Sequence, residues 1–294
     1  LCCDASLLQP ARDEPEQMDA SAGGRPVRFQ HALVQEVVAA ALTRPRRQQL
    51  HRAAFHALAD RPGALVHELA AVLAHHAYHG ALWPEAARFA HMAMARSVAR
   101  SANRDALRIL DTGLDATGRI EDGPTRLMTE LALRSEALGA LWPLGHFDAM
   151  FTHLSRAQAI TAQLGDPKRQ AAVAMQQAVL HWGRGHPGLG LEAAHAAQTA
   201  ALKAGSRSAQ MAAAQVELML YHGLGRYREL VERAREIERN FVAELGAGRT
   251  MMGWATLPGI NLKVFLADAL TRLGEEAVAQ QVCDAAYAEL QVNE

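Results

Sequence analysis

The amino-acid sequence predicts an all-α protein, an α-solenoid in which antiparallel helix hairpins stack on one another. The first observation is composition: half of the 294 residues are hydrophobic, yet aromatic residues make up only 5%. Ala and Leu supply much of the apolar content, and both are among the strongest helix formers. The second is helical periodicity between short turns containing Gly or Pro, and the third is a glycine turn that recurs at a constant interval.

The N-terminal residues follow a different pattern. Two short apolar segments, 5–9 and 27–29, predict the strands of a β-hairpin. The segment between them, 10–26, is rich in Pro, Gly, Asp, Glu and Ser, which predicts a loop or linker. Apolar residues then follow helical spacing in two segments, and Pro45 predicts the end of the first helix.

Gly, Pro and N-cap residues mark the helix ends in the rest of the chain. Gly165-Asp166-Pro167 supplies a left-handed C-terminal residue, an N-cap acceptor and a proline at the first helical position, in that order. Gly205-Ser206 repeats the first two features, and Trp83-Pro84 and His186-Pro187 each open a helix. We therefore expect helices at roughly 64–79, 84–99, 102–116, 125–141, 147–164, 167–183, 188–203, 207–223, 227–243, 260–272 and 275–291.

A glycine turn repeats along the chain. Gly145, Gly185 and Gly225 are evenly spaced, each in the turn between two expected helices, and Gly274 looks like a further copy after a longer insert. A fixed period of one turn per helix pair is the signature of a solenoid, because a single pair cannot bury its apolar stripe alone. We expect a right-handed superhelix with a concave groove.

The turn and the helix after it resemble tetratricopeptide (TPR) repeats of the looser type. In the segment 224–230, followed by Ala234 and Ile237, the Gly, aromatic and small or apolar positions fall where that repeat has them. The same pattern occurs at Gly145, Phe147, Met150, Leu154 and Ala157. The observed period exceeds the about 34 residues of the standard repeat and is closer to that of maltose-regulator-like transcription activators.

A second, more specific resemblance covers residues 28–105. Arg28–Val37 and Arg46–His51 resemble the end of the winged-helix module of STAND-type signalling ATPases, which occur in LuxR-type regulators and beside class III adenylate cyclases. Leu73–His76 and Trp83–Ala87 resemble that family's first repeats. The resemblance divides the chain into a winged-helix remnant at 1–60, with a long wing or linker at 10–26, and TPR-like repeats at 61–294.

The resemblance also implies a functional context. In the family an ATPase core precedes this signature, ATP or ADP binds to that core, and the repeats act as a sensor or inhibitory arm. The chain begins without Met, which we interpret as a fragment of a longer protein. A Gly-rich loop ending in Gly-Lys-Ser/Thr is absent from the sequence, so we expect no cofactor and no catalytic site in this segment.

His31 is the candidate cofactor-binding residue. In STAND proteins of the apoptotic and plant-resistance type, a winged-helix His-Asp motif contacts the phosphate of the bound nucleotide. Phe29-Gln30-His31-Ala32-Leu33 resembles that motif, with Ala32 in place of Asp. An imidazole at a helix start can donate to a phosphate with the help of the helix dipole. A phosphate contact in the intact protein and a packing or capping role both remain open.

His75, His76 and His79, with His67 and Glu68 upstream, form the candidate metal cluster. His75 and His79 are four residues apart and share a helix face, as zinc ligands on helices do. No Cys partner accompanies them, so our preferred interpretation is structural or surface histidines, with no metal ligand assigned. A metal-dependent helical enzyme that uses these three residues is the less favoured hypothesis.

Other patterns restrict partners and location. Gly183–Gly188 matches the dinucleotide fingerprint literally but follows a helix instead of the required strand.

The net charge is −1 and no apolar run is long enough to span a bilayer, which argues against nucleic acid and membrane partners. The odd number of cysteines without metal spacing favours a reduced, cytoplasmic protein. The local basic cluster is interpreted as a solvated helix face: Arg44, Arg46, Arg47 and Arg52.

Together these observations predict the regulatory arm of a STAND-type ATP-binding signalling protein or transcription regulator. Its partners are expected to be other proteins or its own upstream ATPase domain. A sensor that binds a small-molecule inducer in the concave groove is the alternative.

Overall fold

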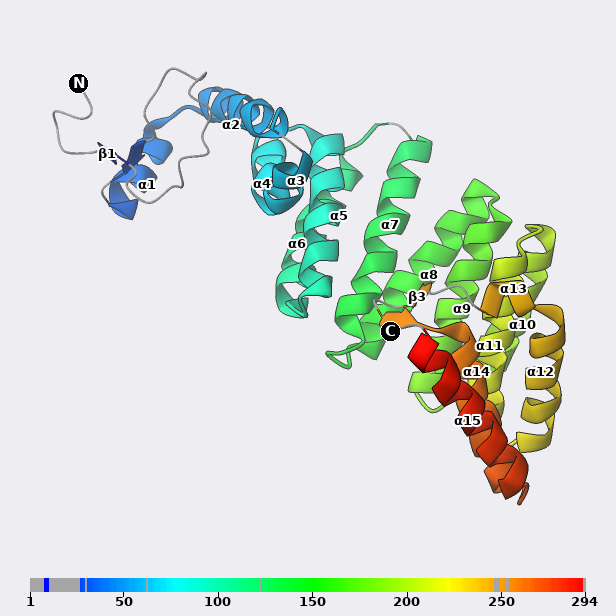
Figure 1. Cartoon of the computed structure of the whole chain (residues 1–294). Coiled ribbons are helices and arrows are strands. Elements are labelled where there is room, and N and C mark those ends of the chain that lie inside the picture. Colours follow the sequence, from blue (N-terminus) through cyan, green and yellow to red (C-terminus); the bar gives the residue numbers. More distant parts are fainter. Residues whose placement is uncertain are drawn as a thin grey trace.

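The computed structural model describes residues 8–10, 27–29, 31–61, 63–121, 123–245, 249–251 and 254–292. These residues form helices and two short β-hairpins (Figure 1). The strands are β1 Leu8–Pro10, β2 Val27–Phe29, β3 Arg249–Met251 and β4 Trp254–Thr256. The helices are α1 Ala32–Ala41, α2 Arg44–Ala59, α3 Gly63–Glu68, α4 Ala70–His79, α5 Trp83–Ala99, α6 Asn103–Gly118, α7 Gly123–Leu141, α8 Phe147–Leu164, α9 Pro167–Gly183, α10 Pro187–Lys203, α11 Arg207–Gly223, α12 Tyr227–Asn240, α13 Val242–Leu245, α14 Pro258–Arg272 and α15 Glu276–Val292.

The helices from α4 onward form a stack that follows the order of the chain (Figure 1). Each helix from α4 to α11 packs against the next one in sequence, and α14 packs against α15. Alternate helices also touch, as in the pairs α5–α7, α9–α11 and α11–α14. A chain in which each helix contacts only its near neighbours is an α-solenoid, so this part of the prediction is confirmed.

A left-handed turn residue recurs through the middle of the stack at half the glycine spacing expected from the sequence. In the turn after α9, the amide of Gly185 donates to the carbonyl oxygen of Trp182 at 2.9 Å, and the amide of His186 donates to that of His181 at 2.8 Å. This pair of hydrogen bonds is the Schellman motif. The glycine spacing seen in the sequence therefore spans two structural units, and each unit consists of one helix and one turn. The glycine of each turn has a positive φ: Gly145, Gly165, Gly185, Gly205 and Gly225.

The same turn occurs earlier in the stack without glycine. Ala81 and Ser101, separated by the same one-helix unit, have φ of 53° and 58°. The amide of Ser101 donates to Val98 and that of Ala102 to Ser97, each at 2.9 Å, which reproduces the Schellman pair. The one-helix unit thus extends to the α4–α5 and α5–α6 turns, where residues with a Cβ occupy the left-handed position at a steric cost.

Replacing Ser101 with glycine is expected to raise the free energy of unfolding by about 1 kcal/mol, because glycine removes the Cβ clash of the left-handed conformation. Chemical denaturation followed by circular dichroism measures the change. Ser155→Gly, in the exposed face of α8, is the control and should lower stability by about 0.5 kcal/mol. Equal losses in both variants would contradict the strained-turn account.

The predicted helix caps are confirmed in the central repeats. The Asp166 side chain accepts a hydrogen bond from the Arg169 amide at 3.1 Å, and Gly165 precedes it in the left-handed conformation. The Ser206 hydroxyl accepts from the Ala209 amide at 3.3 Å. Prolines lie at the first turn of α5, α9 and α10, as expected.

Three predicted boundaries are wrong. The helix expected at 64–79 is interrupted at Leu69, which separates α3 from α4. The helix expected at 227–243 ends at Asn240, because Phe241 has φ −127° and ψ 34°. Pro45 lies in the first turn of α2, where its missing N–H costs nothing, and does not end α1.

Small side chains line the seams of the stack. Between α4 and α5, for example, the side chains of Ala77, Ala86 and Ala90 are each at most 1% exposed. Larger side chains such as Phe89 and Leu73 fill the space between these seams and are also buried. Because small residues let helices approach closely, the Ala-rich composition and the stacked architecture agree.

The N-terminal hairpin is present, and α2 is joined to the repeats. β1 pairs antiparallel with β2, with Leu8 opposite Phe29, as predicted. Residues 1–7 and 11–26, which include the expected start of the first strand and most of the wing, lie outside the described residues.

Helix α2 shares a hydrophobic core with α4 and α5. Phe55 of α2 is buried there against Phe89 of α5, with ring centroids 5.7 Å apart. α2 therefore packs on the first repeat.

Candidate functional site

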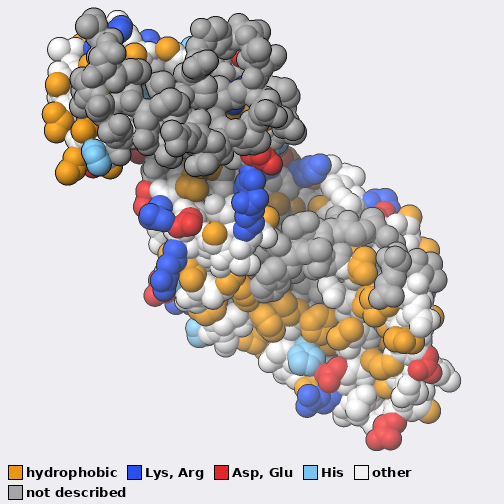
Figure 2. Space-filling view, turned by 60° about the vertical axis from the view of Figure 1, so that its left-hand side comes forward, with side chains coloured by type: hydrophobic (Ala, Val, Ile, Leu, Met, Phe, Trp, Pro, Cys, Tyr) orange, Lys and Arg blue, Asp and Glu red, His pale blue; other side chains and the backbone are white. Residues whose placement is uncertain are grey.

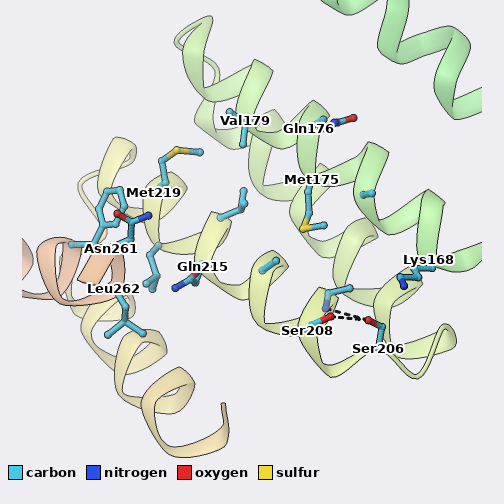
Figure 3. Close-up of a pocket in the computed structure, with 16 residues that line it drawn as sticks. Lys168, Met175, Gln176, Val179, Ser206, Ser208, Gln215, Met219, Asn261 and Leu262 are labelled. Atoms are coloured by element: carbon cyan, nitrogen blue, oxygen red, sulfur yellow. Dashed lines mark hydrogen bonds between the residues drawn. The ribbon is translucent and has the colours of Figure 1, made fainter. Parts of the chain in front are cut away.

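A cavity of about 510 Å³ lies between α9, α11 and α14, and we call it the α9–α11–α14 groove (Figure 3). These are the first helices of three successive hairpins, so the stack places them on the same side. The groove is lined by Lys168, Ala172, Met175, Gln176, Val179, Ser206, Ser208, Ala209, Ala212, Gln215, Val216, Leu218, Met219, Asn261, Leu262 and Phe265.

Most of the groove wall is apolar and adaptable. Met175 of α9, Met219 of α11 and Leu262 of α14 lie around the space (Figure 3). Phe265 of α14 also lines it. Methionine side chains are flexible and polarizable, so they accommodate apolar groups of different shapes. On the face shown in Figure 2, hydrophobic side chains form a band across the lower body of the molecule, with charged side chains at its margins.

A few polar groups make the two ends of the groove chemically different. Lys168 lies at one end beside Ser206 and Ser208, near the N-termini of α9 and α11 (Figure 3). Among the lining residues that the structure describes, Lys168 carries the only charge. Because helix N-termini also attract negative charge, this end favours an anionic group.

Two glutamines that line the groove, Gln176 and Gln215, differ in their hydrogen bonding. The Gln215 side-chain amide donates to the carbonyl oxygen of Pro258 at 2.6 Å, which ties α11 to the start of α14. Gln176 Oε1 is buried and accepts no hydrogen bond from the described residues. A buried acceptor without a donor is costly, and this oxygen is closed to solvent and therefore to a molecule in the groove. The groove therefore combines apolar walls with a few polar side chains.

The candidate histidines of α4 are brought together with one that the sequence analysis missed. His51 of α2 lies over the α4 surface, with its ring centroid 5.5 Å from His75, 5.2 Å from His76 and 5.0 Å from His79. The His75 and His79 centroids are 4.5 Å apart. We call these four residues the histidine cluster. His67 is not among these ring contacts, and its carbonyl oxygen accepts from Arg96 at 3.0 Å.

The pKa is lowered for three members of the histidine cluster: His51, His76 and His79. Burial, followed by the neighbouring histidines and Arg47, lowers the pKa of His51 to about 4. Burial and the neighbouring histidines also lower the pKa of His76, and burial, His75 and Arg47 lower that of His79. Cations this close repel one another, so His51, His76 and His79 favour the neutral imidazole at neutral pH.

His31 lies at the entry to α1. It is exposed, and its carbonyl oxygen accepts from the Val34 amide at 3.1 Å, which begins the first turn. Leu33 and Val37 of α1 are also exposed, at 73% and 68%. The phosphate contact of His31 remains a prediction about the intact protein.

The remaining sequence patterns have structural positions that explain them. Gly183–Gly188 forms the turn between α9 and α10, where no strand precedes the glycines. In the basic cluster, Arg52 donates to the carbonyl oxygen of Gly80 at 2.6 Å and so holds α2 against the end of α4. None of the described helices combines the length and hydropathy needed to cross a bilayer.

Comparison with known proteins supports the fold. No family model matches the chain. It is similar to the TPR-like repeats of a kinesin light chain of Podosopora anserina, with 17% identity, a TM-score of 0.55, and coverage of 72% of this chain and 98% of that one. A variant of the same protein gives 18% identity, a TM-score of 0.55, and coverage of 70% and 95%. The predicted fold class, an all-α TPR-like solenoid, is confirmed.

A sequence relative covers part of the chain. An uncharacterized protein of Rhizobium meliloti (strain 1021) is 34% identical over 116 residues, which is 40% of this chain and 11% of that protein. The matched segment is thus a small portion of a much longer polypeptide.

Proposed function

We propose that the chain is the protein-interaction arm of a STAND-type signalling ATPase or transcription regulator, and that it binds an extended protein segment in the α9–α11–α14 groove. The single observation that carries the binding role is the groove itself, formed by the first helices of three successive hairpins. Stacked repeats bind partners on such surfaces through a few anchoring side chains.

The groove chemistry specifies the kind of segment. Met175, Met219 and Phe265 accept an apolar side chain. Lys168, at the serine-lined end, pairs with a carboxylate. The expected occupant is therefore an extended peptide with an apolar anchor and an acidic residue, supplied by a partner protein or by the upstream ATPase domain.

The STAND context draws on the winged-helix resemblance at residues 28–105. Under this proposal residues 1–60 are the winged-helix remnant and residues 61–294 are the repeats, and the packing of α2 on α4 supports a direct connection between the two parts. The match of this chain to a small part of a long relative is consistent with an arm attached to further domains. We expect the coding sequence upstream to contain a Gly-rich phosphate loop ending in Gly-Lys-Ser/Thr. Without such a loop, the STAND assignment would fail and the repeat-protein assignment would remain.

Selection from a displayed library of random peptides tests the groove. Selected peptides are expected to share an apolar residue and an acidic residue, and Lys168→Glu should weaken their binding at least about tenfold, which corresponds to about 1.4 kcal/mol. Lys203→Glu is the matched control, because Lys203 is an exposed lysine of α10 outside the lining. Equal effects of the two variants would remove the groove as the binding site.

A small-molecule inducer is the second candidate occupant, because a volume of about 510 Å³ falls in the range of small-ligand pockets. Thermal denaturation in the presence of a metabolite library separates the two candidates. A ligand-dependent rise in Tm that Met219→Lys abolishes, together with no enriched peptide, would favour the inducer.

A further inference from the structure

The histidine cluster lies in the contact between α2 and α4, far from the groove. The ring centroids of His75 and His79 are 4.5 Å apart, and that of His51 lies between 5.0 and 5.5 Å from the three rings of α4. Among the residues that the structure describes, no three His, Cys, Asp or Glu are placed to hold a metal ion, so the metal hypothesis gains no support. Four imidazoles at one interface can instead respond to protons, because histidine titrates close to neutral pH.

His51 belongs to the face of α2 that contacts the repeats. Gln48, His51, Arg52 and Phe55 follow helical spacing and therefore share this face. Phe55 is buried in the apolar core shared with α4 and α5. The side chains of Gln48 and Arg52 donate to the carbonyl oxygen of Gly80 at 3.3 and 2.6 Å. A change in the charge of His51 therefore acts directly on the contact between the two helices.

The hydrogen bond between His51 and His76 requires at least one neutral ring. Their Nδ1 atoms lie 3.0 Å apart, so one nitrogen must donate and the other must accept. A doubly protonated imidazole has no acceptor nitrogen. When both rings are protonated, two N–H groups face each other, the hydrogen bond is lost, and two positive charges repel across the interface.

The charges that act on these rings are positive. Burial, followed by the α4 histidines and Arg47, lowers the pKa of His51 to about 4. Burial and neighbouring cationic groups also lower the pKa of His76 and His79. Arg52 adds a further cation where α2 meets the end of α4. The interface therefore becomes unfavourable as its histidines gain protons.

The other helices packed against α4 supply no compensating carboxylate among the described residues. Asp115 of α6 accepts a hydrogen bond from the Tyr78 hydroxyl at 2.6 Å. Neither Asp115, Arg88 of α5, nor His67 and Glu68 of α3 is among the groups that shift the pKa values of the three histidines. Protonation of the cluster therefore adds charge that the described surroundings do not neutralise.

We propose that the α2–α4 contact is a pH switch in which protonation of the histidine cluster releases α2 from the repeats. Released histidines titrate near the ordinary pKa of about 6.5, whereas the docked rings have lowered pKa values, so the docked state binds fewer protons. The docking free energy is therefore fully present above about pH 6.5 and is lost as the pH falls toward about 4. Release would change how the N-terminal residues are held against the repeats, and it does not depend on the peptide proposed for the groove.

Hydrogen exchange of the full chain at pH 7 and pH 5, corrected for the intrinsic pH dependence of exchange, tests the switch. The protection of the α2 amides is expected to fall at least about tenfold at pH 5 relative to the amides of α9, because release exposes α2 to local unfolding. An α2 protection that does not fall relative to α9 would overturn the proposal. A parallel fall in both helices would also overturn it, because the whole stack would then unfold together.

His51→Gln removes the ring that α2 contributes, and the fall in α2 protection should shrink to less than about threefold. His56→Gln is the matched control, because His56 is an exposed histidine of the same helix outside the cluster, and the full fall should remain. If His51→Gln responded to pH as the unaltered chain does, the cluster would not be the switch.

A charge reversal tests the same inference without removing a histidine. Arg47→Glu places a carboxylate beside His51 and His79, which stabilises their protonated forms, so α2 should stay docked to a lower pH. Arg46→Glu makes the same charge change at an exposed neighbour that does not act on these rings, and the release should stay at the original pH. Equal responses of the two variants would contradict a local electrostatic switch.

Discussion

Replacing Arg233 with methionine is expected to lower the free energy of unfolding by about 3 kcal/mol. Arg233 of α12 donates through Nε to Glu217 of α11 at 2.7 Å, and the two side chains are only 18% and 5% exposed. Methionine retains most of the volume but leaves the Glu217 carboxylate buried without its arginine partner, with the more distant His195 ring at 4.0 Å beside it. A buried charge that loses its partner costs far more than an exposed pair contributes.

Two further variants establish that the loss comes from the uncompensated charge. Arg226→Met removes an exposed pair with Glu229, whose side chains are 46% and 44% exposed, and should cost less than about 1 kcal/mol. The double variant Arg233→Met/Glu217→Leu should recover much of the loss, because it replaces the pair with apolar groups. Urea denaturation measures all three. If the double variant were no more stable than Arg233→Met, the effect would come from lost packing instead.

The helix ends of the central repeats could be predicted because local chemistry determines them. Gly165, Asp166 and Pro167 specify a stop, a cap and a start within three residues, and the structure places each as expected. The turns at Ala81 and Ser101 could not be found in this way, since they adopt the glycine conformation without glycine. Without glycine or another turn-forming residue type, a local sequence pattern does not mark these positions as left-handed.

The candidate sites were less accessible to sequence analysis. His75, His76 and His79 lie on one helix, so their proximity follows from helical spacing, but His51 joins them through the packing of α2 on α4. The groove is assembled from α9, α11 and α14, and the insert containing β3 and β4 separates the last of these from the others. Periodicity shows that each helix has an apolar face, but the stacking of the hairpins decides which residues remain open to a ligand.

Replacing Gly190 with valine is expected to lower the free energy of unfolding by about 3 kcal/mol. Gly190 is buried in α10, where a Cβ would lie 2.4 Å from Cδ2 of Leu220 and 3.0 Å from the carbonyl oxygen of Ala178. Leu220 is itself fully buried, and the Ala178 carbonyl belongs to the α9 backbone. Room for the valine therefore requires α10 to move away from both α9 and α11.

The same substitution two residues earlier is the control. Gly188 follows Pro187 at the start of the same helix, and a Cβ there meets nothing within 4 Å, so Gly188→Val should change stability by less than about 0.5 kcal/mol. Urea denaturation of the two variants isolates the steric term, because both exchange glycine for valine in the first turn of the same helix. Since α9 and α11 also form two walls of the groove, Gly190→Val should weaken binding of the selected peptides as well. If Gly190→Val were as stable as Gly188→Val, α10 could move away from α9 and α11 at little cost. That result would contradict the close helix packing on which the stack depends.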